Sequence, residues 1–319
     1  MQDCLSYHTD LGYPMSNWIW ILLVIGAALA QTVRNSAQRS FAGEGGILGA
    51  TLVRFLYGAP FSVLLVVSTG MVVPSEKLIM NMSTTYYGWV AVGAISQATA
   101  TGLLLSAMVE RSFVVAVAFS KTELIQVAVL GTIFLNEKPS TLLLLAILIM
   151  LVGVSALANL GNMKSRSMIT GAGIARGLAC GVFFAMSSIA FRAAGTKMVS
   201  LYPESALFAS VWSVLLAQII QTAILGGWIA WTQPAALKNV FATGATPWLA
   251  GFAGAVASTG WFFAVILRPV AEVRTLGMLD MVFSYAVSRI WFHEPTTRRE
   301  LFGISALVAG ALVAVCSTL

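Results

Sequence analysis

The chain has 319 residues, of which 58% are hydrophobic and only 9% are charged, and its mean hydropathy is +0.87. A soluble domain carries about a quarter charged residues, because its surface faces water. The composition therefore excludes a soluble globular protein. The net charge of +6 comes from basic residues that stand singly between apolar runs, a pattern that excludes a nucleic-acid interface and is typical of short loops between membrane spans.

The sequence carries no motif for catalysis, metal binding or cofactor binding. Its three cysteines are far apart, and His293 and Glu294 lack the second histidine of a zinc-protease HExxH motif. Asp280 lies in LGMLDM, which differs from the Gly-x-Gly-Asp setting of intramembrane aspartyl proteases. No GxSxG, phosphate loop or dinucleotide fingerprint is present. We therefore predict no enzyme, no catalytic residue, no cofactor and no metal site.

The first residues differ in character from the rest of the chain. Residues 1–16 lack the basic region of a signal peptide, and Met15 resembles a start site directly before the first apolar run. We expect residues 1–16 to be an N-terminal extension, and the apolar run that follows to act as an uncleaved anchor.

Apolar runs of membrane-spanning length fill the remainder. A helix needs about 20 apolar residues to cross the hydrocarbon core, and short polar breaks such as residues 74–77 and 136–139 separate runs of this length. The pattern predicts an all-α integral membrane protein with ten transmembrane helices, at residues 18–37, 47–68, 87–108, 113–135, 141–159, 170–191, 205–230, 247–267, 273–292 and 300–318.

The two halves of the chain align with each other at a shift of 157 residues. At this shift Arg111 aligns with Arg268, Glu123 with Asp280, Glu137 with Glu294, and Gly153 with Gly310. Each half contains five predicted spans, an odd number, so the second half must enter the membrane in the opposite orientation. The sequence thus predicts two inverted five-helix repeats, at residues 17–160 and 161–319. Many secondary transporters have this architecture, with the substrate site between the repeats.

Two stretches carry a family resemblance. GTIFLNEKPSTLLLLAILIMLVGV and SRIWFHEPTTRRELFGISALVAGALVAV each contain an apolar helix, a short loop with an acidic residue, and a last helix with a late glycine. Together with ten spans in two halves, they resemble the drug/metabolite transporter superfamily, and most closely its EamA-type members. Asn136 and His293 stand where glycine is usual in that family. The resemblance implies a transporter, more specifically an exporter, of small organic metabolites or drugs.

Charged residues inside predicted spans are the first candidates for a site, because each costs roughly 2.5–3.5 kcal/mol to insert. Lys121 and Glu123 lie near the middle of the fourth span, and Asp280 lies near the middle of the ninth. Lys121 and Glu123 are two residues apart, so they point about 200° apart on the helix. We therefore expect Glu123, which shares a face with Gln126, to face a substrate or proton pathway, and Lys121 to form an interhelical pair. The alternative is a buried ionic cluster that only holds the halves together.

Polar stripes on other spans are further candidates. Gln31, Arg34, Asn35 and Gln38 follow helical spacing at the end of the first span, where they would face either a wet cavity or water beyond the last turn. Similar stripes join Asp280 to Ser284 and Ser288, and Gln97 to Thr101.

The remaining features have simpler explanations. The Gly173, Gly177 and Gly181 run is expected to pack tightly within the chain, or alternatively to form a dimer seam. Arg54 is interpreted as reaching the membrane surface, and Arg192, Arg268 and Arg274 as loop charges.

The predicted function is secondary active transport by alternating access across the plasma or inner membrane. The predicted partners are a small-molecule substrate and the lipid bilayer, with the chain as a monomer or a homodimer and with no nucleic acid. The alternative is a channel or a structural membrane subunit without active transport.

Overall fold

The structure is a computed structural model that describes residues 18–73, 79, 81–109, 120–158, 171–242, 244–292 and 298–318. The predictions for residues 1–16, Arg111 and Glu294 lie outside these ranges. Within them every regular element is a helix and no strand occurs. The helices are α1 (Ile19–Leu56), α2 (Ala59–Gly70), α4 (Thr84–Val109), α6 (Glu123–Leu135), α7 (Thr141–Ala158), α8 (Gly171–Leu201), the short η2 (Pro203–Ser205), α9 (Ala206–Thr232), α10 (Pro234–Ala242), α11 (Ala245–Leu267), α12 (Val270–Leu276), α13 (Leu279–Phe292) and α14 (Arg298–Cys316).

Seven helical segments in the described part are long and apolar enough to cross a membrane. They are Ile19–Gly43, Gly45–Gly70, Thr84–Ser106, Ala175–Leu201, Ala206–Thr232, Ala245–Leu267 and Arg298–Cys316. The helices Glu123–Leu135 and Thr141–Leu157 are apolar but shorter. Large apolar side chains such as Leu64 and Leu148 are exposed on the outside of the bundle, where lipid rather than water is their natural solvent. This is the build of a multi-pass, all-helical membrane protein.

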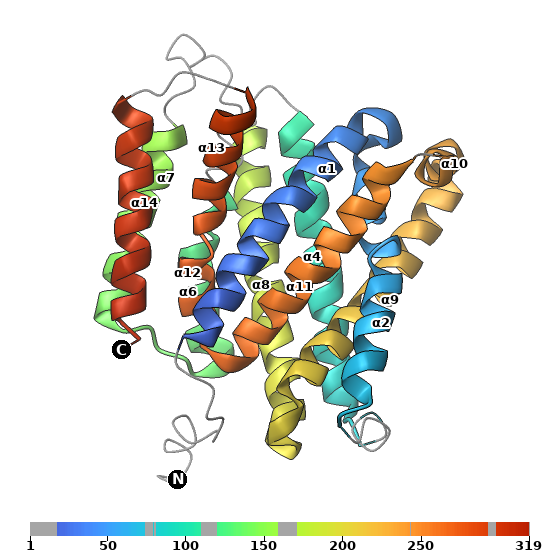
Figure 1. Cartoon of the computed structure of the whole chain (residues 1–319), viewed down its shortest axis with the longest axis horizontal. Helices are drawn as coiled ribbons and strands as arrows, with labels where there is room; N and C mark the ends of the chain where they lie inside the picture. Colours follow the sequence, from blue (N-terminus) through green and yellow to red (C-terminus); the bar gives the residue numbers. More distant parts are fainter. Residues whose placement is uncertain are drawn as a thin grey trace.

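The helices pack in long antiparallel pairs. α1 lies along α11, α4 lies along α8, and α7 lies along α14 at one edge of the bundle (Figure 1). Glycines permit the closest of these approaches: a Cβ at Gly153 would lie 2.7 Å from the carbonyl oxygen of Gly303 in the α7–α14 pair. Such close backbone contact is the usual role of small residues between membrane helices.

Two of the expected spans are interrupted. The predicted span 273–292 is two helices, α12 and α13, separated by a turn at Gly277 and Met278. In the predicted span 113–135 the described part has a turn at Lys121 and Thr122, and α6 begins only at Glu123. The prediction of continuous helices at these two places is therefore wrong. A break leaves backbone N–H and C=O groups without helical partners, which a membrane protein tolerates only where the break is buried in protein or lines a cavity.

The first span is also longer than predicted. Helical structure continues past residue 37 to a kink at Gly46, whose φ of 68° is readily adopted only by glycine. The polar stripe that begins at Gln31 therefore lies within the span rather than at its end.

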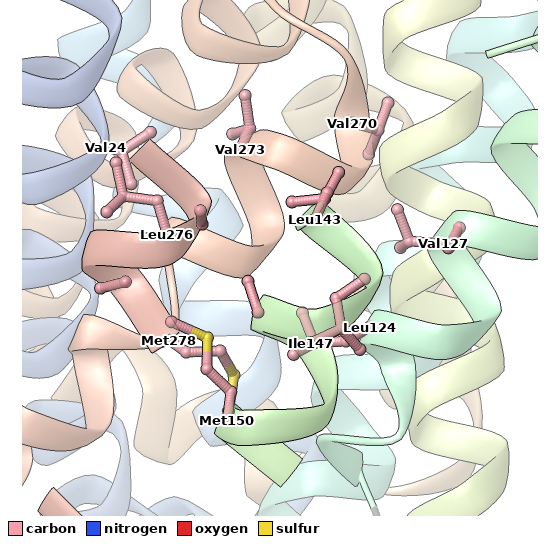
Figure 2. Close-up of a cluster of buried hydrophobic side chains, with 14 of the residues drawn as sticks. Val24, Leu124, Val127, Leu143, Ile147, Met150, Val270, Val273, Leu276 and Met278 are labelled. Atoms are coloured by element: carbon pink, nitrogen blue, oxygen red, sulfur yellow. The ribbon is translucent and has the colours of Figure 1, made fainter. Parts of the chain in front are cut away.

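The largest apolar core cluster lies where the interrupted helices meet. Figure 2 shows Leu124 of α6 and Leu143 and Ile147 of α7 facing Val270, Val273 and Leu276 of α12. All six side chains are nearly fully buried. This cluster joins the first half of the chain to the second, and Leu124 and Met278 at its edge also line the cavity described next.

Candidate functional site: a charged cavity between interrupted helices

Two ion pairs stand at the helix breaks. Lys121 Nζ lies 2.9 Å from Asp280 Oδ2 and 3.2 Å from Oδ1. Arg274 donates from Nε to Glu123 Oε1 at 2.6 Å, and its Nη2 also pairs with that oxygen. In both pairs one partner comes from the first half of the chain and the other from the second. The four side chains are mostly buried, with exposed fractions between 8% and 17%.

Both acids occupy corresponding positions in their helices. Glu123 is in the first turn of α6, and Asp280 is in the first turn of α13. The partial positive charge at a helix N-terminus favours a carboxylate at this place. Starting a helix inside the span therefore provides a local electrostatic reason why each acid can be buried.

The ion pairs surround a small cavity. It is lined by Gln31, Lys121, Glu123, Leu124, Trp261, Arg274, Gly277, Met278 and Asp280. The volume open to the centres of water-sized molecules is about 20 Å³, which is room for about one water. The cavity is therefore polar and hydratable, but far too small in this conformation for an organic metabolite.

An amide and an indole complete its wall. Gln31 donates from Nε2 to Asp280 Oδ2 at 2.9 Å, and its Oε1 accepts from Trp261 Nε1 at 3.1 Å. The Arg274 guanidinium lies over the indole ring of Trp261, with its central carbon 5.1 Å from the ring centroid. Helices α1 and α11 are thus tied to both ion pairs by one chain of hydrogen bonds and cation–π contact.

Two further arginines are buried beside this cavity. Arg34, one turn beyond Gln31 on α1, donates to Asn35 Oδ1 at 2.8 and 3.2 Å. Arg54 donates to Thr101 Oγ1 at 3.0 Å and to Ser258 Oγ at 3.4 Å. Each of these arginines is 3% exposed. The interpretation of Arg54 as a residue that reaches the membrane surface is wrong.

The structure unites some of the predicted site residues and separates others. Gln31, Lys121, Glu123 and Asp280 line the cavity together. The expectation that Lys121 and Glu123 face opposite ways is wrong, because it assumed a continuous helix through the turn at Lys121 and Thr122. The predicted interhelical pair of Lys121 is present.

The other predicted residues do not line the cavity. Gln97 accepts from Gln221 Nε2 at 3.0 Å, on the α4–α9 contact. Gln126 donates to Thr122 Oγ1 at 3.4 Å and packs near Gly181 of α8, where an added Cβ would lie 2.7 Å from Gln126 Oε1. Gly181 therefore serves packing within the chain, as the first of its two interpretations predicted.

Residues missed by the sequence analysis include Arg274 and Trp261. The pattern places Arg274 among the loop charges, because it lies only six residues after Arg268 at the start of an apolar run. Arg274 lies only six residues before Asp280, and this short separation could have indicated a second charge inside the same span. The alignment of the two halves does not indicate it, because Arg274 aligns with the apolar Val117. Trp261 is one apolar aromatic among many in the sequence.

A second ionic cluster joins the halves nearer the end of the bundle at which α6 ends. Arg192 of α8 pairs with Glu137 Oε1 and donates to the carbonyl oxygen of Arg268 at 2.8 Å. Glu137 Oε2 accepts from the backbone N–H of Val270 at 3.3 Å. The interpretation of Arg192 as a loop charge is wrong, since it is 5% exposed. This cluster, which we call the end clasp, fastens the α6–α7 linker to the α11–α12 linker.

Comparison with known proteins bears on the fold of the chain. No family model and no curated protein matches the chain. A solved structure described only as "Crystal structure of protein" aligns with a TM-score of 0.69 and 16% identity, over 92% of this chain and 96% of that chain. The TM-score shows that the two chains share a fold, and at this low identity the likeness carries no information about activity.

Proposed function

We propose that the chain is a secondary active transporter that moves a small organic molecule by alternating access between two inverted five-helix repeats. The observation that carries the proposal is the presence of two ion pairs at the helix breaks. We call them the crossed pairs, because each joins a residue of the first half of the chain to a residue of the second half. Intramembrane charges are rare and mark substrate or ion pathways. Discontinuous helices at the interface of two repeats are the usual place for substrate and coupling-ion sites.

The element bounds support the repeat. Shifting α6 and α7 by 157 residues places them on 280–292 and 298–315, which are the bounds of α13 and α14 to within one residue. The same shift places the turn at Lys121 and Thr122 on 278–279, at the second break. The helix pairs repeat as well: α1 lies along α11, and their counterparts α8 and α4 lie along each other.

The directions of the helices support inversion. In Figure 1 α1 rises from the lower end of the bundle, whereas α8, its counterpart, descends from the upper end. The start of α1 and the end of α14 lie at the same end, as an even number of crossings requires. In the described part, the seven spans of sufficient length, the shorter helices α6 and α7, and α12 taken together with α13 would make ten crossings.

The depth of the two acids fits a shared site. Glu123 is 12 residues from the end of α6, and Asp280 is 10 residues from the start of α12. At a rise of 1.5 Å per residue these distances are about 18 and 15 Å, close to half of the roughly 30 Å hydrocarbon core. Each acid can thus exchange its cation from the opposite repeat for a proton or a substrate group when the repeats rock.

Reconstituted vesicles provide the test. The purified full chain in liposomes loaded with a panel of unlabelled anionic, neutral and cationic metabolites is offered the same compounds in labelled form outside. A transporter gives saturable uptake that is accelerated by unlabelled compound inside, known as counterflow. Ohmic conductance without counterflow supports the channel alternative, and the absence of both across the panel supports a structural subunit.

A further inference from the structure

We propose that the transported substrate carries an anionic group, a carboxylate or a phosphate, and that Arg34 and Arg54 bind it. This inference rests on the proposed function and adds the chemical class of the substrate. It follows from the charge balance of the region, the position of the two arginines, and the chemistry of the guanidinium group.

Two of the cationic side chains in this region, Arg34 and Arg54, have no acidic partner among the described residues. Both acids at the cavity already have a cation, Lys121 for Asp280 and Arg274 for Glu123. Among the described residues no carboxylate pairs with Arg34 or Arg54, whose hydrogen bonds go to one amide and two hydroxyl oxygens. Among the residues that the structure describes, this region therefore holds four cationic and two anionic side chains. Burying a charge without a counter-ion is costly, so the excess of two positive charges favours an anion from outside the chain.

The two arginines lie together on one face of α11. A Cβ at Gly254 would be 3.1 Å from Arg54 Cγ and 3.5 Å from Arg34 Cδ, so both side chains cross the same glycine. Ser258, one turn further, accepts from Arg54. Trp261, the next residue on this face, lines the cavity. Gly254, Ser258 and Trp261 follow i, i+4, i+7 spacing and form one stripe that runs from the arginines to the ion pairs.

The missing side chain at Gly254 has a consequence for the stripe. A methyl group there would crowd the Arg54 stem, at 3.1 Å from its Cγ, and would only touch the Arg34 stem, so glycine gives Arg54 room to cross α11 beside Arg34. The electrostatic interactions of Arg34 extend to Asp280 and Arg274 as well as to Arg54. The charge of an anion bound beside Arg34 therefore acts on Asp280 as well. This electrostatic interaction links substrate binding to the ion pair of Asp280 and Lys121.

The guanidinium group is suited to this ligand. Its planar fork donates two parallel hydrogen bonds to a carboxylate or a phosphate, and it remains charged when buried. A cationic substrate, in contrast, would have to displace Lys121 or Arg274 from its acid and would approach two unneutralised arginines. An anion instead removes the repulsion between Arg34 and Arg54 as it binds.

Four compounds that share a benzene ring and differ in charge test the inference: benzoate, phenyl phosphate, benzamide and benzamidine. The midpoint of thermal unfolding of the detergent-solubilised full chain is measured against the concentration of each, at constant ionic strength, because a ligand that binds only the folded state raises the midpoint. We expect benzoate or phenyl phosphate to raise it in a saturable way, and benzamide and benzamidine to leave it unchanged.

Variants locate the binding site. Arg34→Gln and Arg54→Gln should each weaken anion binding about 10- to 100-fold, as expected for the loss of charged hydrogen bonds. Arg34→Lys and Arg54→Lys, which keep the charge and lose the fork, should fall between these variants and the parent. Arg268→Gln is the matched control, because Arg268 pairs with Glu272 in the α11–α12 region and does not line the cavity; it should retain binding.

The results separate this inference from the proposed function. Stabilisation by benzamidine instead of the anions overturns the inference, as does anion binding that survives both glutamine substitutions. If the glutamine variants do not fold, the parent protein and the lysine variants still decide. Saturable counterflow of a cationic or neutral compound, with no binding of either anion, retains the transporter and refutes the anionic substrate.

Discussion

Replacing Arg274 by glutamine would leave Glu123 buried without its cation. Only 8% of the Glu123 side chain and 15% of the Arg274 side chain are exposed, so little water can replace the lost partner. Removing one member of a buried pair costs about 3–5 kcal/mol, and the partial exposure of Arg274 places the expected loss near the lower end, at about 3 kcal/mol. The loss of the contact with Trp261 adds about 0.5–1 kcal/mol.

A double-mutant cycle isolates the interaction itself. Glu123→Gln combined with Arg274→Gln removes both charges, so the double variant should be more stable than Arg274→Gln alone, with a coupling energy of about 2 kcal/mol. The more exposed pair of Arg268 and Glu272 is the control and should give about 0.2–1 kcal/mol. Equilibrium unfolding in mixed micelles, followed by tryptophan fluorescence, measures the parent and the variants of both cycles. Additive effects at the Glu123–Arg274 pair, or a coupling no larger than that of the control, would refute the reasoning.

Three further predictions concern the end clasp, helix packing and coupling. Glu137→Ala should leave the buried Arg192 without its acid and lower stability by about 3 kcal/mol, and modification of cysteines placed in the adjacent linkers should become faster; unchanged rates would show that the end clasp does not hold this end closed. Gly251→Ala should destabilise the protein strongly, because the new Cβ would lie 2.4 Å from the backbone at the α1–α2 junction. Gly26→Ala, which has open space at the Cβ position, should be neutral or stabilising by up to about 1 kcal/mol. Similar melting curves for the two variants would contradict the packing. Asp280→Asn should abolish gradient-driven accumulation and retain counterflow if this acid carries the coupling proton; an unchanged pH dependence of transport would exclude it.

The alignment of the two halves of the sequence makes part of the site predictable. The sequence alone is enough to align Glu123 with Asp280. A charge inside an apolar run is easy to recognise, and a second charge at the same shift as the rest of the alignment is easier still. Lys121 is visible for the same reason. The alignment cannot show that each acid pairs with a cation from the other half of the chain, since Lys121 aligns with Met278 and Arg274 aligns with Val117.

The errors in the fourth and ninth spans share one physical cause, which is the assumption of unbroken helices. A helical projection through Lys121 and Glu123 separates them, but the turn between them brings both to one cavity. The same emphasis on uniform spans ends the first one at residue 37 and leaves open whether Gln31 and Arg34 face a cavity or water. Breaks of this kind leave a weak signal in composition, because their backbone groups are satisfied by tertiary contacts that sequence periodicity does not report.

The most direct test of the account is whether the two repeats rock about the charged cavity. Spin labels at Lys138→Cys and Lys197→Cys report the distance between the repeats at one end of the bundle, and labels at Ser40→Cys and Lys238→Cys report it at the other; all four side chains are exposed. Pulsed dipolar spectroscopy in nanodiscs at acidic and alkaline pH, with and without Asp280→Asn, yields the distance distributions. The account predicts two distance populations at each end of the bundle, with the short distance at one end accompanying the long distance at the other. The proportions of the two populations should change with pH, and Asp280→Asn should remove this change. A single unchanging distance at both ends, in protein that shows counterflow, would contradict alternating access between the repeats.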